Sequence, residues 1–185
     1  MKKIYKDNKG FSLVELIVVV LIMAIVAVAL APQVMKWVEN SRIASDLEMR
    51  SNIENNCILA IANEEVFNLV KDGGYEIVIT KPLSGPVTFD YYENPGTPGA
   101  SPIPYTGGNR PDPDTNAFWS AFLKIGDFDD FEEFEDAVAI KSSPAGGSPI
   151  VLHVYVYQGG HTFSELDGAV SGDLNVGLNG SASET

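Results

Sequence analysis

The sequence of 185 residues contains one cysteine, two histidines and few basic side chains. A single cysteine, Cys57, excludes an intrachain disulfide framework and any metal site built from several cysteines. His153 and His161 leave little room for a histidine-based zinc centre, and no cofactor is expected. The 12 basic residues stand against 25 acidic ones, for a net charge of −13. Because phosphate binding needs clustered lysine and arginine, no direct binding of nucleic acid is expected.

A long apolar run lies near the N-terminus and is almost free of charge. Residues 11–31 contain one charged side chain, Glu15. As a helix this run would be about 32 Å long, which matches a hydrocarbon core of about 30 Å. Four lysines between residues 2 and 9 precede it, so the positive-inside rule keeps the N-terminus cytoplasmic and sends the rest outward. An ordinary secretory signal peptide is the alternative, but the run is long for one and Pro32 follows the best cleavage site directly.

The segment Lys9–Leu16, with the sequence KGFSLVEL, resembles the class III leader junction of type IV pilins and pseudopilins. In that family a prepilin peptidase cuts after the glycine, here Gly10, and methylates the new N-terminal residue, here Phe11. The family glutamate, here Glu15, pairs with the N-terminal amine of a neighbouring subunit during assembly. A proline also recurs at the position of Pro32. The chemistry agrees, because cleavage would create a cation four residues from a lone carboxylate in an apolar fibre core.

The resemblance implies a structural subunit, not an enzyme, that polymerises through its apolar helix into a type IV pilus or pilus-like filament. The implied partners are further copies of the chain, other pilins, the prepilin peptidase and the pilus assembly platform in the membrane. The implied location is the inner or cell membrane as a single-pass precursor, and then an extracellular pilus. The expected division is a leader at 1–10, a transmembrane and assembly helix at 11–32, and a globular head at 33–185.

The helix is expected to continue beyond the apolar run. Pro32 lacks an N–H group and predicts a kink there. Apolar residues then recur at spacings of three to five, the helical period, with charged residues of both signs between them. This pattern predicts an amphipathic half-helix that extends to about residue 72, before Gly73 and Gly74.

The remainder of the chain predicts an antiparallel sheet, so the expected fold is α+β and pilin-like, with one very long N-terminal helix, kinked near Pro32, packed on the sheet. Short runs rich in β-branched and aromatic residues predict strands, and one apolar pattern predicts a further helix with Thr115 as its possible cap. The expected strands are 75–80, 87–92, 137–141, 149–158 and a weak edge strand at 172–178, and the expected helix is 117–125. Many pilins close this region with a disulfide, which is absent here, so sheet hydrogen bonds, the aromatic cluster or a bound ion would have to hold it.

Residues 127–136 combine phenylalanines three apart with many acids. Asp127, Asp129 and Asp130 are candidate calcium ligands, although EF-hand spacing and its central glycine are missing. The favoured interpretation is a short helix with its phenylalanines toward the core and its carboxylates toward water. A catalytic carboxylate pair is a third interpretation.

A membrane-anchored extracellular enzyme or glycan-binding domain is the alternative function. Its site would be the loop at 94–113, which is rich in proline and glycine. An anchored enzyme has no need for Gly10, Phe11 and Glu15 at their spacing, whereas a polymer subunit does. The sequence therefore favours the filament subunit.

Overall fold

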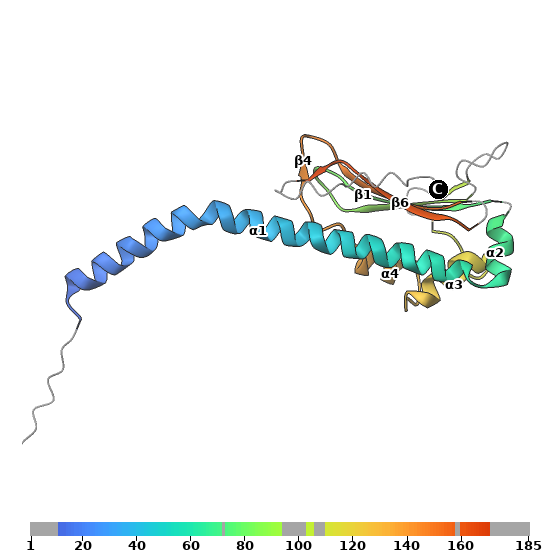
Figure 1. Cartoon of the computed structure of the whole chain (residues 1–185), viewed down its shortest axis with the longest axis horizontal. Coiled ribbons are helices and arrows are strands. Elements are labelled where there is room, and N and C mark those ends of the chain that lie inside the picture. The colour runs from blue at the N-terminus through green and yellow to red at the C-terminus, as the bar shows by residue number, and fades with distance from the viewer. Residues whose placement is uncertain (1–10, 72, 94–102, 106–109, 158–159, 171–185) are drawn as a thin grey trace, which may run out of the picture. The chain divides into compact units, whose positions relative to one another are not determined.

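A computed structural model of the chain describes residues 11–71, 73–93, 103–105, 110–157 and 160–170. The chain forms two compact units, Met1–Val38 and Glu39–Thr185. The described part of the first is helical, and the second is an α+β head in which helices cover one face of an antiparallel sheet (Figure 1). The expected pilin-like α+β fold, with a very long N-terminal helix, is confirmed.

The main sheet of the head has the strand order β3-β2-β1-β5-β6, and all neighbouring strands are antiparallel. Its strands are β1 (Tyr75–Lys81), β2 (Thr88–Glu93), β3 (Ile103–Tyr105), β5 (Ile150–Val156) and β6 (Thr162–Asp167). Side chains in β5 alternate strictly between buried and half-buried, because every second one points to the helices. A separate ladder joins β4 (Pro144–Ala145) to β7 (Ala169–Val170).

Helix α1 runs from Leu13 to Ile61, and a separate helix α2 spans Glu64–Lys71. The expectation of one continuous helix to residue 72 is therefore wrong. Asn63 explains the break, because its side-chain oxygen accepts the backbone N–H of Glu65 at 2.9 Å, an N-cap contact that begins a new helix. The acidic first turn of α2 adds a favourable interaction with the helix dipole.

Helices α3 (Ala117–Ile125) and α4 (Phe131–Ala137) supply most of the aromatic core. Asn116, not Thr115, caps α3, since its side chain accepts the N–H groups of residues 118 and 119. Trp119 is fully buried and lies at the centre of the cluster. Its ring is within 4.8–6.3 Å of the rings of Tyr75, Tyr91, Phe118, Phe122 and Phe131.

The strands differ from the expectations in three places. Residues 138–141 form no strand, because the backbone N–H of Lys141 bonds to a helix carboxylate and not to a neighbouring strand. Strand β6 was not expected, and β3 falls within the segment expected to be loop. The predicted edge strand at 172–178 lies outside the described residues.

Candidate functional site

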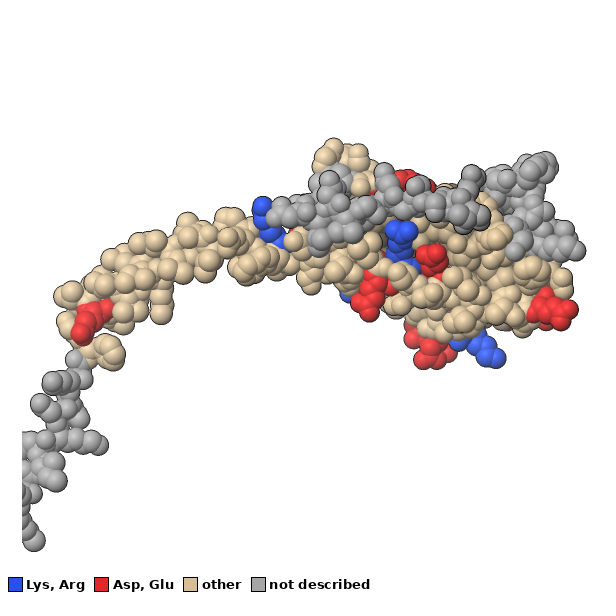
Figure 2. All heavy atoms as spheres, viewed as in Figure 1, with Lys and Arg blue, Asp and Glu red and all other residues tan. Residues whose placement is uncertain are grey.

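The first part of α1 exposes its apolar side chains. In the segment from Leu13 to Val38 most large apolar residues are between 44% and 76% exposed. Helix α1 is long and apolar enough to cross a membrane. None of the 18 residues in its most apolar stretch is buried. Figure 2 shows this part as an almost uncharged surface, while acidic and basic side chains gather on the head. Since water solvates such a surface poorly, lipid or another helix is its natural environment.

Glu15 lies in the first turn of α1, where its Oε2 accepts the backbone N–H of Ser12 at 2.9 Å. This contact satisfies one of the N–H groups that a helix start leaves without an internal partner. Phe11 precedes it and is 89% exposed. Gly10 lies outside the described residues. The carboxylate thus stands at the helix start as the one acidic group of an otherwise apolar segment.

Pro32 lies inside α1, which continues for 29 further residues to Ile61. Proline has no N–H to donate, so the carbonyl of Val28 loses its helical partner. The kink expected here stays a prediction.

A polar seam joins the second part of α1 to the segment at 141–143 within the head. Asp46 is 2% exposed and accepts the backbone N–H of Lys141 at 2.7 Å and that of Ser142 at 2.8 Å. It also accepts the hydroxyl of Ser142 at 2.5 Å. Glu39 is 7% exposed and accepts the backbone N–H of Ser143. Two helix carboxylates therefore replace a neighbouring strand as acceptors for this stretch of backbone.

The same seam continues to strand β6. Arg50 donates from Nε to the hydroxyl oxygen of Ser164 and from Nη2 to its carbonyl oxygen, both at 2.7 Å. The Ser164 hydroxyl then donates to Glu54 at 2.6 Å. The sequence pattern had placed Glu39, Asp46 and Arg50 between the apolar positions of an amphipathic helix. Their partners are backbone groups and serines far along the chain, so helical periodicity carried no signal for them.

Cys57 is 1% exposed in the core, where burial raises the pKa of its thiol. Cys57 is therefore a free, buried cysteine of the core. The seam and the aromatic cluster thus connect the C-terminal half of the head to α1.

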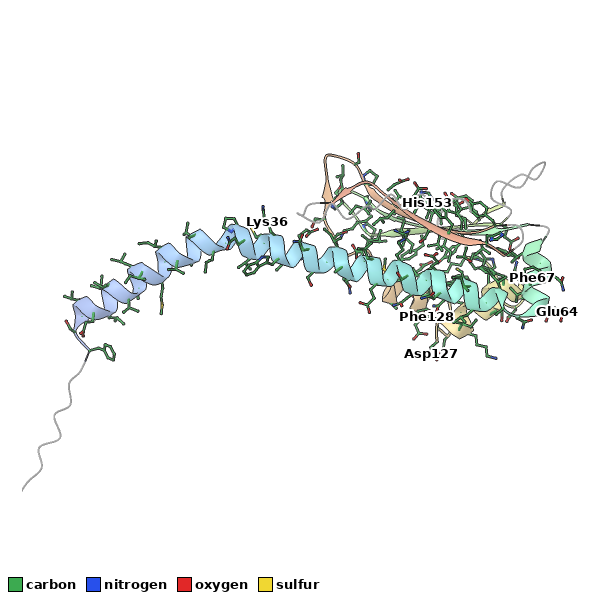
Figure 3. All side chains as sticks on the ribbon, in the orientation of Figure 1. Lys36, Glu64, Phe67, Asp127, Phe128 and His153 are labelled. Carbon is green, nitrogen blue, oxygen red and sulfur yellow. The ribbon has the colours of Figure 1, made fainter. Side chains whose placement is uncertain are left out.

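The outer face of the sheet carries a histidine–carboxylate pair. His153 on β5 lies 2.8 Å from Glu76 on β1, from Nδ1 to Oε1, and both side chains are largely buried. The His153 ring stacks on that of Tyr155 with centroids 5.7 Å apart. His153 is marked on this face in Figure 3. The hydrogen bond to Glu76 raises the pKa of His153 against the opposing effect of burial, and the charges of Glu165 and Asp167 add to the increase.

This pair predicts a stability that depends on pH. Because the folded-state pKa of His153 is raised above its unfolded value of about 6.5, the stabilisation is complete below that pH. It is lost as the pH rises through the raised folded-state pKa. We expect the melting temperature to fall across this window, and to fall less in Glu76→Gln. Equal slopes for both proteins in thermal scans at several pH values would contradict the assignment.

The acidic segment after α3 serves helix capping. Asp130 caps α4 by accepting the N–H groups of Glu132 and Glu133 at 2.8 and 2.9 Å, and the backbone N–H of Asp129 bonds to Glu133. Phe131 and Phe134 are buried, as the favoured interpretation predicts. Asp127 has a positive φ of 60° and lies at the turn between α3 and α4. Within the described ranges, no three acidic, histidine or cysteine side chains come together as a possible metal site.

The loop at 94–113, proposed as the site of an anchored enzyme or glycan-binding domain, is described only at 103–105 and 110–113. Arg110 at its end forms an ion pair with Glu135 of α4 at 2.8 Å. Glu135 also accepts the hydroxyl of Tyr91 at 2.9 Å. These contacts fix the end of the loop to the core and form no nucleophile or acid–base constellation among themselves.

Comparison with known families adds one finding. Residues 5–31 match the family model of the prokaryotic N-terminal methylation motif. Neither a curated protein nor a solved structure matches the chain. The N-terminal segment thus carries the class III prepilin leader signature, followed by a long apolar helix. This motif supports a type IV pilin or pseudopilin-type subunit, a class whose members are usually structural and not enzymes.

Proposed function

We propose that the chain is a structural subunit of a type IV pilus or pilus-like filament. The observation that carries the proposal is the coincidence, in one segment, of the methylation motif at 5–31 and a long helix whose apolar side chains are exposed. Before assembly this surface anchors the precursor in the membrane with its N-terminus cytoplasmic. After assembly, the same surface packs against the corresponding helices of neighbouring copies.

Processing supplies the cation that Glu15 needs. A prepilin peptidase cuts after Gly10 and methylates Phe11, which leaves a positive amine at the new N-terminus. In the filament, the amine of one subunit pairs with Glu15 of a neighbouring subunit. Burying either charge alone is expensive, so the pair forms only when subunits assemble in register. The membrane assembly platform and other pilins are the remaining partners.

The mature chain is expected to begin at Phe11 and to contain 175 residues, the full 185 less the ten of the leader. The physical reason is that a cut after Gly10 removes the charged, cytoplasmic leader. The membrane helix that is left can then enter an apolar fibre. Intact-mass measurement of protein from the native host checks the result. A chain that retains Met1, or that begins at Pro32, would contradict the proposed function.

A further inference from the structure

A groove in the head runs between α1 and the α3–α4 pair. Its volume is about 460 Å³, within the range of about 300–1,000 Å³ that ligand sites occupy. Its apolar side includes Met49 and Ile53 of α1, Phe128 of the α3–α4 turn and Phe134 of α4. Each of these residues belongs to the head unit, so the groove is a feature of the head itself.

Three asparagines of α1 form the polar side of the groove: Asn52, Asn55 and Asn56. Asn52 and Asn55 are exposed and Asn56 is half-buried. Asparagine is a poorer helix former than alanine, so three of them close together in a helix interior are unfavourable for the helix. Such a cost is usually offset by a cap or a hydrogen bond, yet in the described part of the chain none of the three side-chain amides has a protein partner. A carboxamide offers a donor and an acceptor, which suits the peptide groups of another chain segment.

At the α3–α4 turn, Gly126 lets Phe128 and Asn56 approach the backbone closely at the lining of the groove. A side chain at Gly126 would place its Cβ 2.5 Å from the ring of Phe128 and 2.9 Å from Nδ2 of Asn56. The next residue, Asp127, has a positive φ of 60°, a conformation that L-residues seldom adopt. Together they hold the half-buried Phe128 ring against the groove, and Figure 3 shows Asp127 and Phe128 at this turn.

Charge restricts where two copies of this head can touch. Residues 39–185 contain 7 basic and 23 acidic side chains, a net charge of −16. Two such surfaces repel each other wherever acids meet. The groove is an exception, because its lining includes one acid, Glu48, and one base, Lys141, and is otherwise uncharged.

A second uncharged surface lies on the loop between β1 and β2. Residues 82–87 contain no charged side chain, and the loop exposes Leu83, which is 59% accessible. Pro82 and Pro86 flank this leucine, and because the ring of each proline fixes its own φ, the loop has less conformational freedom. The loop is therefore a stiff apolar projection on an acidic head.

We propose that Leu83 of one copy inserts into the groove of the next copy, with the groove asparagines bonding to the backbone of the inserted loop. The proposal rests on the proposed polymerisation. Loop and groove are different surfaces of the same chain, so the contact is heterologous and extends into an open array instead of closing as a dimer. The filament would then be held by this contact between heads as well as by the packing of the apolar helices.

Cysteine cross-linking in the full-length chain, expressed in its native host, tests the contact. Filaments of the double variant Leu83→Cys/Asn55→Cys are sheared from cells, mildly oxidised and separated in denaturant without reductant. We expect a ladder of linked subunits that collapses to monomer with reductant. The matched control is Leu83→Cys/Ser51→Cys, because Ser51 is exposed on the same helix but does not line the groove. Buried Cys57 is present in both and does not compete.

The outcomes separate this inference from the proposed function. A ladder at least fivefold stronger than in the Ser51 control supports the contact. If filaments form normally but the Asn55 variant gives no ladder, or a ladder equal to that of the Ser51 control, the proposed contact is overturned and the filament function stands. A native chain that forms no filaments overturns the proposed function, and the contact with it.

Substitution of the loop residue gives a second readout. Leu83→Asp adds a charge to an exposed loop, so folding is retained, while the apolar insertion is lost. We expect the yield of sheared filaments to fall at least tenfold, whereas Leu83→Met keeps the native yield. Equal yields from both variants would overturn the proposal.

Discussion

Glu15→Ala is expected to accumulate as processed protein in the membrane, with few or no filaments. Removing a charge from an apolar run does not harm membrane insertion, and the leader and cleavage site are unchanged. Assembly differs, because the amine of Phe11 on the neighbouring subunit loses its partner in a medium of low dielectric. Breaking a buried pair costs about 3–5 kcal/mol, which is roughly a hundredfold or more per contact. Electron microscopy and fractionation of membranes and sheared filaments measure the two pools.

The structure supplies a sharper variant, Glu15→Gln. In the precursor, Glu15 accepts the N–H of Ser12, and a glutamine oxygen can accept the same hydrogen bond without the charge. Glutamine therefore separates helix capping from ion pairing. We expect it to fail in assembly as alanine does, while Glu64→Ala, which removes an exposed acid in the first turn of α2, assembles normally. Abundant filaments from Glu15→Gln would assign Glu15 a capping role alone.

The elements that sequence predicted well are those whose signal is local. The run of β-branched and aromatic residues at 149–158 predicted β5, and the apolar pattern at 117–125 predicted α3, which has four buried residues. The apolar run and the KGFSLVEL junction predicted the membrane helix and the leader, which the methylation motif supports. In each case the residues that specify the structure are neighbours in the sequence.

The failures have a common cause, because the deciding partner lies far away along the chain. Residues 137–141 are rich enough in apolar side chains to predict a strand, but Asp46 takes the backbone N–H of Lys141. The local spacing of apolar residues cannot predict a hydrogen bond between residues that are 95 positions apart. The break in the long helix is different, since Asn63 followed by two glutamates is an N-cap signal that was available.

Asp46→Ala is expected to destabilise the head strongly. The carboxylate is buried and accepts two backbone N–H groups and one hydroxyl from the adjacent residues Lys141 and Ser142. Alanine leaves these donors without an acceptor, at about 1–3 kcal/mol for each buried group that stays unsatisfied. We expect a loss of roughly 3 kcal/mol or more, which for a chain of this size lowers the melting temperature by about 6–12 °C. Thermal unfolding of the full chain in detergent micelles, followed by near-ultraviolet circular dichroism, measures the shift.

Two further variants show whether the seam, and not helix propensity, causes the loss. Glu48→Ala removes an exposed acid two positions along the same helix and should change the free energy of unfolding by less than about 0.5 kcal/mol. Asp46→Asn keeps the shape but directs an amide N–H₂ at a backbone N–H donor, so it should lose most of the same stability. If Asp46→Ala melts within a degree or two of Glu48→Ala, water replaces the carboxylate at little cost. The segment at 141–143 would then be held by the buried residues Val138 and Ile140 before it and by the β4–β7 ladder after it. The head would then need no polar seam to stand in for the missing disulfide.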